Sequence, residues 1–129
     1  MRVLLDTHAV LWWLAGDPQL SELAKATISD EANQLFVSAA SAWEVTMKHR
    51  LGKLPGAGPL ALDFSLEMKR NDFVELPISW RHAQAAGALP GPHRDPFDRM
   101  LIAQAREEKM ALVSNEKVFG AYDGVTLIW

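Results

Sequence analysis

The sequence predicts an α/β fold in which helices cover both faces of a central, mainly parallel sheet. Short apolar runs bounded by polar residues alternate along the chain with longer segments of helical spacing. Strands that are separated by helices usually pair in parallel, and the helices then bury both faces of the sheet. The chain has 129 residues, 49% of them hydrophobic and 22% charged, which is enough for one globular core. We therefore expect a single domain over residues 1–129.

The first half of the chain supplies two of the expected strands. Residues 2–5 (RVLL) form an apolar run that ends at Asp6, and residues 35–38 (LFVS) form another. Helical spacing and helix-start signals predict the helices between and after them. These helices are residues 8–16, which stop at a glycine; residues 20–33, with Ser21 as N-cap; residues 39–54; and, after a PGAGP loop at 55–59, residues 60–72.

The second half continues the alternation. Apolar runs typical of strands occupy residues 73–77 (FVELP), 111–114 (ALVS) and 125–129 (VTLIW). The helices that we expect here are residues 80–89, a long helix from Pro96 onward, and a short one around residues 117–122.

Composition narrows the class of protein. The absence of cysteine excludes disulfides and thiolate zinc sites. A net charge of −3 argues against broad electrostatic binding to nucleic acid, but it permits a nucleic-acid enzyme that holds cations in an acidic pocket. Asp6, Thr7 and His8 interrupt the first apolar run too early for a signal peptide, and no run reaches the roughly 18 residues of a membrane span. We expect a cytoplasmic protein without membrane contact.

Acidic residues recur near the predicted carboxyl ends of strands, where α/β folds form their sites. Asp6 directly follows the first strand, and Glu44 lies in the opening turns of the helix after the second. Asp98 lies near the start of the helix before the fourth strand, and Glu116 follows that strand after Ser114. Each of these acids can therefore fall at the same edge of the sheet.

Asp95 and Asp98 have different expected roles, although they are three residues apart. Asp95 precedes Pro96, and an aspartate N-cap followed by proline is a common helix start. Asp98 would occupy the third helical position, on the same face as Leu101, Ile102 and Ala105. We therefore expect Asp98 at the head of the buried stripe, where a carboxylate needs a cation or hydrogen bonds.

Each acid also has an ordinary structural interpretation when it is considered alone. Asp6 and Asp95 can be helix N-caps, Glu44 can be a solvated helix residue, and Glu116 can support the start of the last helix. Several carboxylates at one edge, however, would repel one another unless divalent cations bind between them. Oxygen ligands without His or Cys pairs suit Mg²⁺ or Mn²⁺ rather than zinc.

Four segments together resemble PIN-domain ribonucleases, specifically the VapC-type toxins of bacterial toxin–antitoxin modules. They are LLDTHAVLWWLAGD, SAASAWEVTMKHRLGKL, LPGPHRDPFDRMLIAQA and LVSNEKVFGAYDGVTLIW, which span the chain nearly end to end. The resemblance implies a three-layer α/β/α sandwich and an acidic pocket for Mg²⁺ or Mn²⁺. It also implies RNA cleavage and inhibition by a cognate VapB-type antitoxin that covers the pocket.

The resemblance also implies roles for individual residues. The family's first aspartate matches Asp6, its helix glutamate matches Glu44, and its third acid matches Asp98, with Asp95 one turn away as a further metal candidate. The family often has Thr-x-Asp after the fourth strand, and this chain has Ser114, Asn115 and Glu116 instead. Ser114 can supply the hydroxyl, and Glu116 is one methylene longer than the aspartate of the family.

The implied reaction is hydrolysis of an RNA phosphodiester. Asp6, Asp98 and Glu116 would hold one or two cations, which lower the pKa of water and neutralise phosphate charge. Glu44 would position a metal or its water, or act as a base. Basic residues that flank the acids are candidate RNA contacts, although a solvated helix face explains any single one as well. They are Lys48, His49, Arg50, Lys53, His93, Arg94 and Arg99.

The remaining conspicuous side chains are assigned to structure or to assembly. His8 and His93 lack partners at metal-ligand spacing. The tryptophans are expected in the core or at interfaces rather than as base-stacking platforms. We expect a homodimer, with apolar helix surface around Leu11, Trp12 and Trp13 used for partner contacts.

Three other functions stay open at this point. A phosphotransferase could use Asp6 as its nucleophile, but His8 stands where a second acid would be expected. A DNA-directed nuclease of related fold is possible because sequence does not show whether a site reads the 2′-hydroxyl. A non-catalytic binding module is the third, and the retained acids weaken it.

Overall fold

The computed structural model describes residues 1–91 and 95–129. Within these ranges, five parallel strands form one sheet: β1 (Arg2–Leu5), β2 (Gln34–Ser38), β3 (Val74–Leu76), β4 (Ala111–Val113) and β5 (Leu127–Ile128). Their order in the sheet is β3-β2-β1-β4-β5, so the first strand of the chain lies at the centre. The predicted parallel sheet is confirmed.

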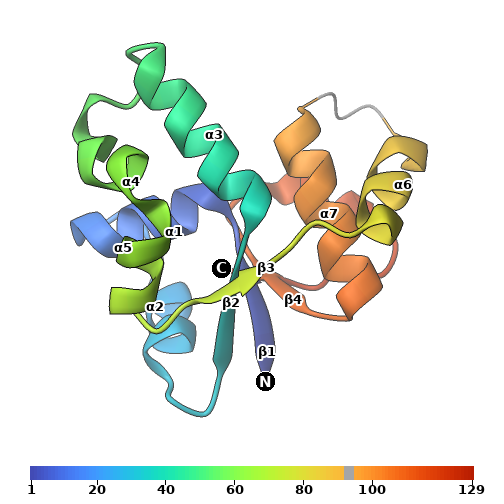
Figure 1. Ribbon diagram of the computed structural model, residues 1–129. Coiled ribbons are helices and arrows are strands. Elements are labelled where there is room, and N and C mark those ends of the chain that lie inside the picture. The colour runs from blue at the N-terminus through green and yellow to red at the C-terminus, as the bar shows by residue number, and fades with distance from the viewer. Residues whose placement is uncertain (92–94) are drawn as a thin grey trace.

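Helices lie on both sides of this sheet, which confirms the three-layer arrangement. One side carries α1 (Thr7–Ala15), α2 (Glu22–Ser29), α3 (Ala39–Arg50), α4 (Gly58–Leu62) and α5 (Phe64–Arg70). The other side carries α6 (Trp80–Ala88) and α7 (Pro96–Glu108), which pack against each other (Figure 1). Short 3₁₀ turns occupy Pro55–Ala57 and Lys117–Ala121. No helix in the described ranges is long and apolar enough to cross a membrane.

The alternation of side chains along β1 divides the core into two clusters. Val3 and Leu5 face the first group of helices, together with Val37 of β2. Leu4 faces the other way, onto Leu101 of α7. A strand buried on both faces needs an uninterrupted apolar run, which is what residues 3–5 provide.

Several helix boundaries follow from caps that the sequence predicts. Ser21 accepts the N–H of Ala24 and begins α2, and Gly16 ends α1 in the left-handed conformation at φ 63°. The single helix predicted over residues 60–72 is wrong, because Asp63 leaves the helical conformation and caps α5 through the N–H of Leu66. The helix predicted to reach residue 54 ends at Arg50, and the loop predicted at 55–59 is helical.

Candidate functional site

The carboxyl edge of the sheet brings together residues from opposite ends of the chain. Leu5 pairs in register with Val113, so Asp6 and Ser114 follow neighbouring strands at the same level. The backbone N–H of Asp6 donates to the carbonyl of Val113 at 3.0 Å. β2 ends beside them and leads into α3, which carries Glu44. The predicted shared edge is therefore present.

Asp6 is a buried carboxylate at this edge. It is only 4% exposed and caps α1 by accepting the N–H of Ala9 at 2.8 Å. The hydroxyl of Ser114 donates to the Asp6 carboxylate and accepts the N–H of Glu116 at 3.0 Å. Burial raises the pKa of Asp6, and the hydrogen bonds from Ser114 and Ala9 partly offset this rise. The charges of two neighbours have smaller effects: His8 lowers the pKa of Asp6, and Glu116 raises it.

Asp6 has hydrogen bonds but no ion-pair partner among the described residues. A buried carboxylate in this condition is costly unless a cation approaches it. Its ligand atoms are oxygens, as are those of Ser114 and Glu116 beside it. This donor chemistry fits a hard divalent cation such as Mg²⁺ or Mn²⁺.

Glu44 is buried as well, which contradicts its interpretation as a solvated helix residue. Its Oε2 atom lies 2.6 Å from Nζ of Lys48, one turn later on α3. The negative charges of Asp95 and Asp98 also act on Lys48. Burial alone would lower the pKa of Lys48, but the hydrogen bond and charge of Glu44, with these two aspartates, raise it.

The structure separates the roles of Asp95 and Asp98 at the start of α7. Asp95 accepts the N–H groups of Phe97 and Asp98 at 2.9 and 3.2 Å, so the predicted N-cap before Pro96 is confirmed. Asp98 lies on the predicted face, but it is half-buried rather than fully buried. The deeply buried part of this stripe begins at Leu101, one turn later, so Asp98 at the head of the stripe keeps contact with solvent.

The polar side chains of this edge thus form two adjoining sets. Asp6, Ser114 and Glu116 form one, and Glu44, Asp95 and Asp98, with Lys48, form the other. Thr7 next to Asp6 links them by a 2.8 Å hydrogen bond to Ser41 of α3. Thr7, His8, Glu44 and Lys48 also line one cavity of about 220 Å³. In the described residues, no three carboxylates or histidines lie close enough to form a ready-made metal cage.

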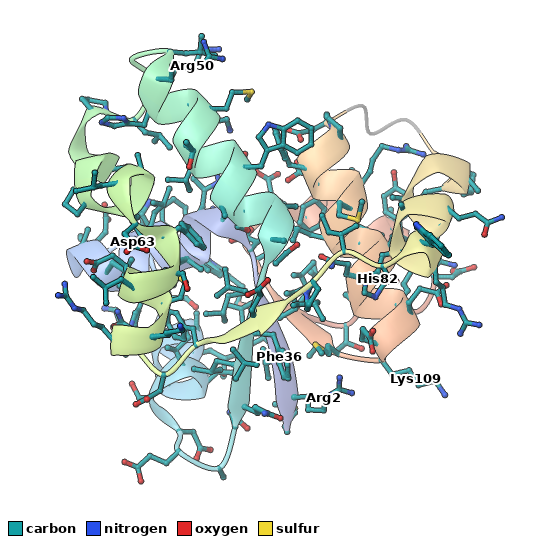
Figure 2. The ribbon with its side chains drawn as sticks, in the orientation of Figure 1. Arg2, Phe36, Arg50, Asp63, His82 and Lys109 are labelled. Carbon is teal, nitrogen blue, oxygen red and sulfur yellow. The ribbon has the colours of Figure 1, made fainter. Side chains whose placement is uncertain are left out.

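The candidate RNA contacts differ in their surroundings. Lys48 is engaged with Glu44, whereas Lys53 is exposed and lines the same cavity. Arg50 is exposed at the end of α3 farthest from the sheet, as Figure 2 shows. Arg99 donates to the carbonyl of Leu89. Arg94 and His93 lie outside the described residues.

Two features of the structure were not anticipated from the sequence. Trp43 is 65% exposed and meets the ring of Phe97 edge-on at 5.1 Å, so it is not a core residue; Trp80 is 95% exposed. His82 is buried between α6 and α7, where its Nε2 atom lies 3.0 Å from Glu108 (Figure 2). Ser79, three residues before His82, was a visible signal for a cap at this position.

Comparisons with known proteins agree with this geometry. The PIN domain family matches residues 3–125. The chain is similar to Ribonuclease VapC16 of Mycobacterium tuberculosis, with 40% identity over 68 residues, covering 53% of this chain and 48% of that protein. It therefore matches only about half the length of VapC16.

A second similarity covers most of the chain. Ribonuclease VapC22 of the same organism is 28% identical over 117 residues, covering 89% of this chain and 87% of VapC22. The fold also matches the crystal structure of VapBC2 from Rickettsia felis bound to a DNA fragment from their promoter. That match has a TM-score of 0.71 and 17% identity, covering 98% of this chain and 97% of that one.

Proposed function

Because this chain belongs to the PIN domain family, we propose that it is a divalent-metal-dependent endoribonuclease and the toxin of a toxin–antitoxin module. The names of VapC16 and VapC22 support the reaction. The observation that carries the proposal is Asp6: a buried carboxylate at the carboxyl edge, without an ion-pair partner in the described residues. Glu44 lies nearby, in a small cavity that Thr7, next to Asp6, also lines.

Asp6 and Asp98 are the proposed ligands of Mg²⁺ or Mn²⁺, with Asp95 and Glu116 as further candidates. When bound, such a cation lowers the pKa of water and neutralises charge on the phosphate. Ser114 holds the Asp6 carboxylate in place by donating a hydrogen bond to it. Glu44 orients the attacking water or accepts its proton, and Lys48 fixes the position of Glu44.

RNA and a VapB-type antitoxin are the proposed partners. The VapC names of the relatives and the VapBC2 complex support the antitoxin. Lys53 is exposed and lines the same cavity as Glu44, and Arg50 is exposed at the far end of α3, so both are available for phosphates. We also propose a homodimer that acts in the cytoplasm, with Trp12 and its neighbours at a partner interface.

Cleavage of defined RNA tests the function. The protein should cut single-stranded RNA with Mg²⁺ or Mn²⁺, lose activity in EDTA, and leave DNA of the same sequence intact. Asp6→Asn should remain folded and cleave at least 100-fold more slowly, because it removes a ligand charge. Asp123→Asn is the matched control, since Asp123 is exposed and lies outside the proposed site.

The outcomes separate the alternatives. Equal cutting of DNA would favour a DNA-directed nuclease, and folded protein without activity on either substrate would favour a binding module. Full activity of Asp6→Asn would refute the assigned site. Mapping the cut positions in total cellular RNA would then identify the target.

A further inference from the structure

We propose that Lys48 is a built-in cation of the acidic edge, which takes the place of a second divalent ion beside Glu44. The edge then holds one metal ion, the one that Asp6 and Asp98 ligate in the proposed function. This inference rests on the proposed function, because it concerns the metal site of that reaction. It is carried by the contacts of Lys48 and by the different surroundings of the two acidic sets.

The Lys48–Glu44 contact is closer and more enclosed than an ordinary helix-surface pair. The two charged atoms are 2.6 Å apart, and the Glu44 side chain is only 5% exposed while that of Lys48 is 28% exposed. An exposed pair at this spacing adds little to the stability of a protein. A buried carboxylate, in contrast, needs a compensating charge to persist in the folded state. Lys48 supplies that charge to Glu44.

The ammonium group of Lys48 also serves the neighbouring helix. Asp95 and Asp98, at the start of α7, act on Lys48 in addition to Glu44. Lys48 therefore pairs with a carboxylate of α3 and lies within electrostatic reach of two carboxylates of α7, a helix that packs against α3. A divalent ion in a two-metal nuclease occupies such a position between converging carboxylates.

The Asp6 side has no equivalent lysine or arginine in the described residues. Among the described residues no lysine or arginine forms an ion pair with Asp6, and the groups that affect its carboxylate are Ser114, Ala9, His8 and Glu116. Asp6 and Glu44 are both buried, yet only Glu44 has an ammonium partner. Glu44 is thus neutralised by the ammonium group of Lys48, whereas Asp6 needs an added cation to neutralise it. Lys48 is a positioning residue in this arrangement, because it acts through Glu44.

Manganese stoichiometry tests the inference without any measurement of RNA cleavage. Mn²⁺ binding is measured by isothermal titration calorimetry and by the electron paramagnetic resonance of free Mn²⁺. Wild type and Lys48→Arg should bind one Mn²⁺ per chain, whereas Lys48→Met should bind two. Lys53→Met is the matched control, because Lys53 lines the same cavity but has no ion pair with Glu44; it should bind one.

Three results would overturn the inference. The first is a wild type that binds two Mn²⁺ ions or none. The second is a Lys48→Met protein that binds a single Mn²⁺ ion with the affinity of wild type. The third is a Lys48→Met protein that binds a single Mn²⁺ ion with higher affinity than wild type. The last result would mean that Lys48 merely repels the metal. Failure of wild type to cleave RNA would count against the proposed function, and it would not alter the stoichiometry comparison.

Lys48→Met leaves Glu44 buried and unpaired, so its folding needs a separate test. If the variant is unfolded in EDTA, Mn²⁺ should restore its cooperative melting transition, with a larger shift than in wild type. The double variant Glu44→Gln, Lys48→Met removes both charges and should fold without metal and bind one Mn²⁺. A Lys48→Met protein that Mn²⁺ does not refold, or a double variant that binds two ions, contradicts the inference.

Discussion

Substitutions of Asp95, at the start of α7, test whether this residue stabilises the fold, takes part in the reaction, or does both. Asp95 accepts two backbone N–H groups that would otherwise lack partners at the helix end. Asp95→Ala removes this acceptor, whereas Asp95→Ser keeps a short oxygen acceptor and removes the charge. Asp95→Asn also keeps the acceptor, in a side chain of the same shape.

The expected cost follows from those two bonds. Replacing an N-cap by alanine lowers the free energy of unfolding by about 1 kcal/mol. For a domain of this size, that is a fall in melting temperature of about 4 °C. Asp95→Ser and Asp95→Asn should lose less than half of this. If the residue is chiefly a cap, both should also keep most of the nuclease activity.

Urea denaturation and RNA cleavage, measured on the same preparations, decide the matter. An Asp95→Ala protein as stable as wild type would refute the capping argument. A folded Asp95→Ser or Asp95→Asn protein without activity would make the Asp95 carboxylate a metal ligand or a holder of water. Loss of activity in Asp95→Ala alone would instead show that the cap positions Asp98.

Two further predictions concern Asp6 and Gly91. Burial raises the pKa of Asp6, so the ionised carboxylate destabilises metal-free protein above that raised pKa, and the penalty disappears below the ordinary pKa of an aspartate. In EDTA at pH 7, Asp6→Asn should therefore be more stable than wild type in urea denaturation. The difference in stability should shrink as the pH falls from the raised pKa of Asp6 to the ordinary pKa of an aspartate. An Asp6→Asn protein that is less stable than wild type at pH 7 would contradict this prediction. Gly91 has φ 109°, and a Cβ there would lie 2.8 Å from the hydroxyl oxygen of Tyr122, so Gly91→Ala should cost about 1–3 kcal/mol by thermal denaturation. Gly56→Ala, which has open space and ordinary φ, is the control and should change stability by less than about 0.5 kcal/mol; equal effects of the two changes would refute the argument.

The sequence was informative where a local signal was sufficient. Arg2–Leu5 was predicted to the residue, because an apolar run that stops at an acid has few other interpretations. Asp95 was identified as a cap for the same reason, since a short acceptor before Pro96 acts on its own backbone. Asp63 was missed because one polar residue does not interrupt helical periodicity, although it interrupts the helix.

Burial was harder to predict, because it depends on distant segments. The four-residue spacing of Glu44 and Lys48 was visible in the sequence and is typical of solvated helix pairs. Only the packing of α3 at the sheet edge places Glu44 out of solvent. Asp98 shows the reverse error: its helical face was right, but its position in the first turn leaves it half-buried.

The central position of β1 has a consequence for how the protein is made. Its partners β2 and β4 leave the ribosome later, β4 long after β1. At about 5–20 residues per second, β1 waits several seconds for that second neighbour. Non-local parallel pairing adds further delay, because loop closure precedes its stabilising contacts. Until β4 is made, Asp6 lacks Ser114 beside it, so a nascent chain does not yet have the complete acidic edge of the sheet.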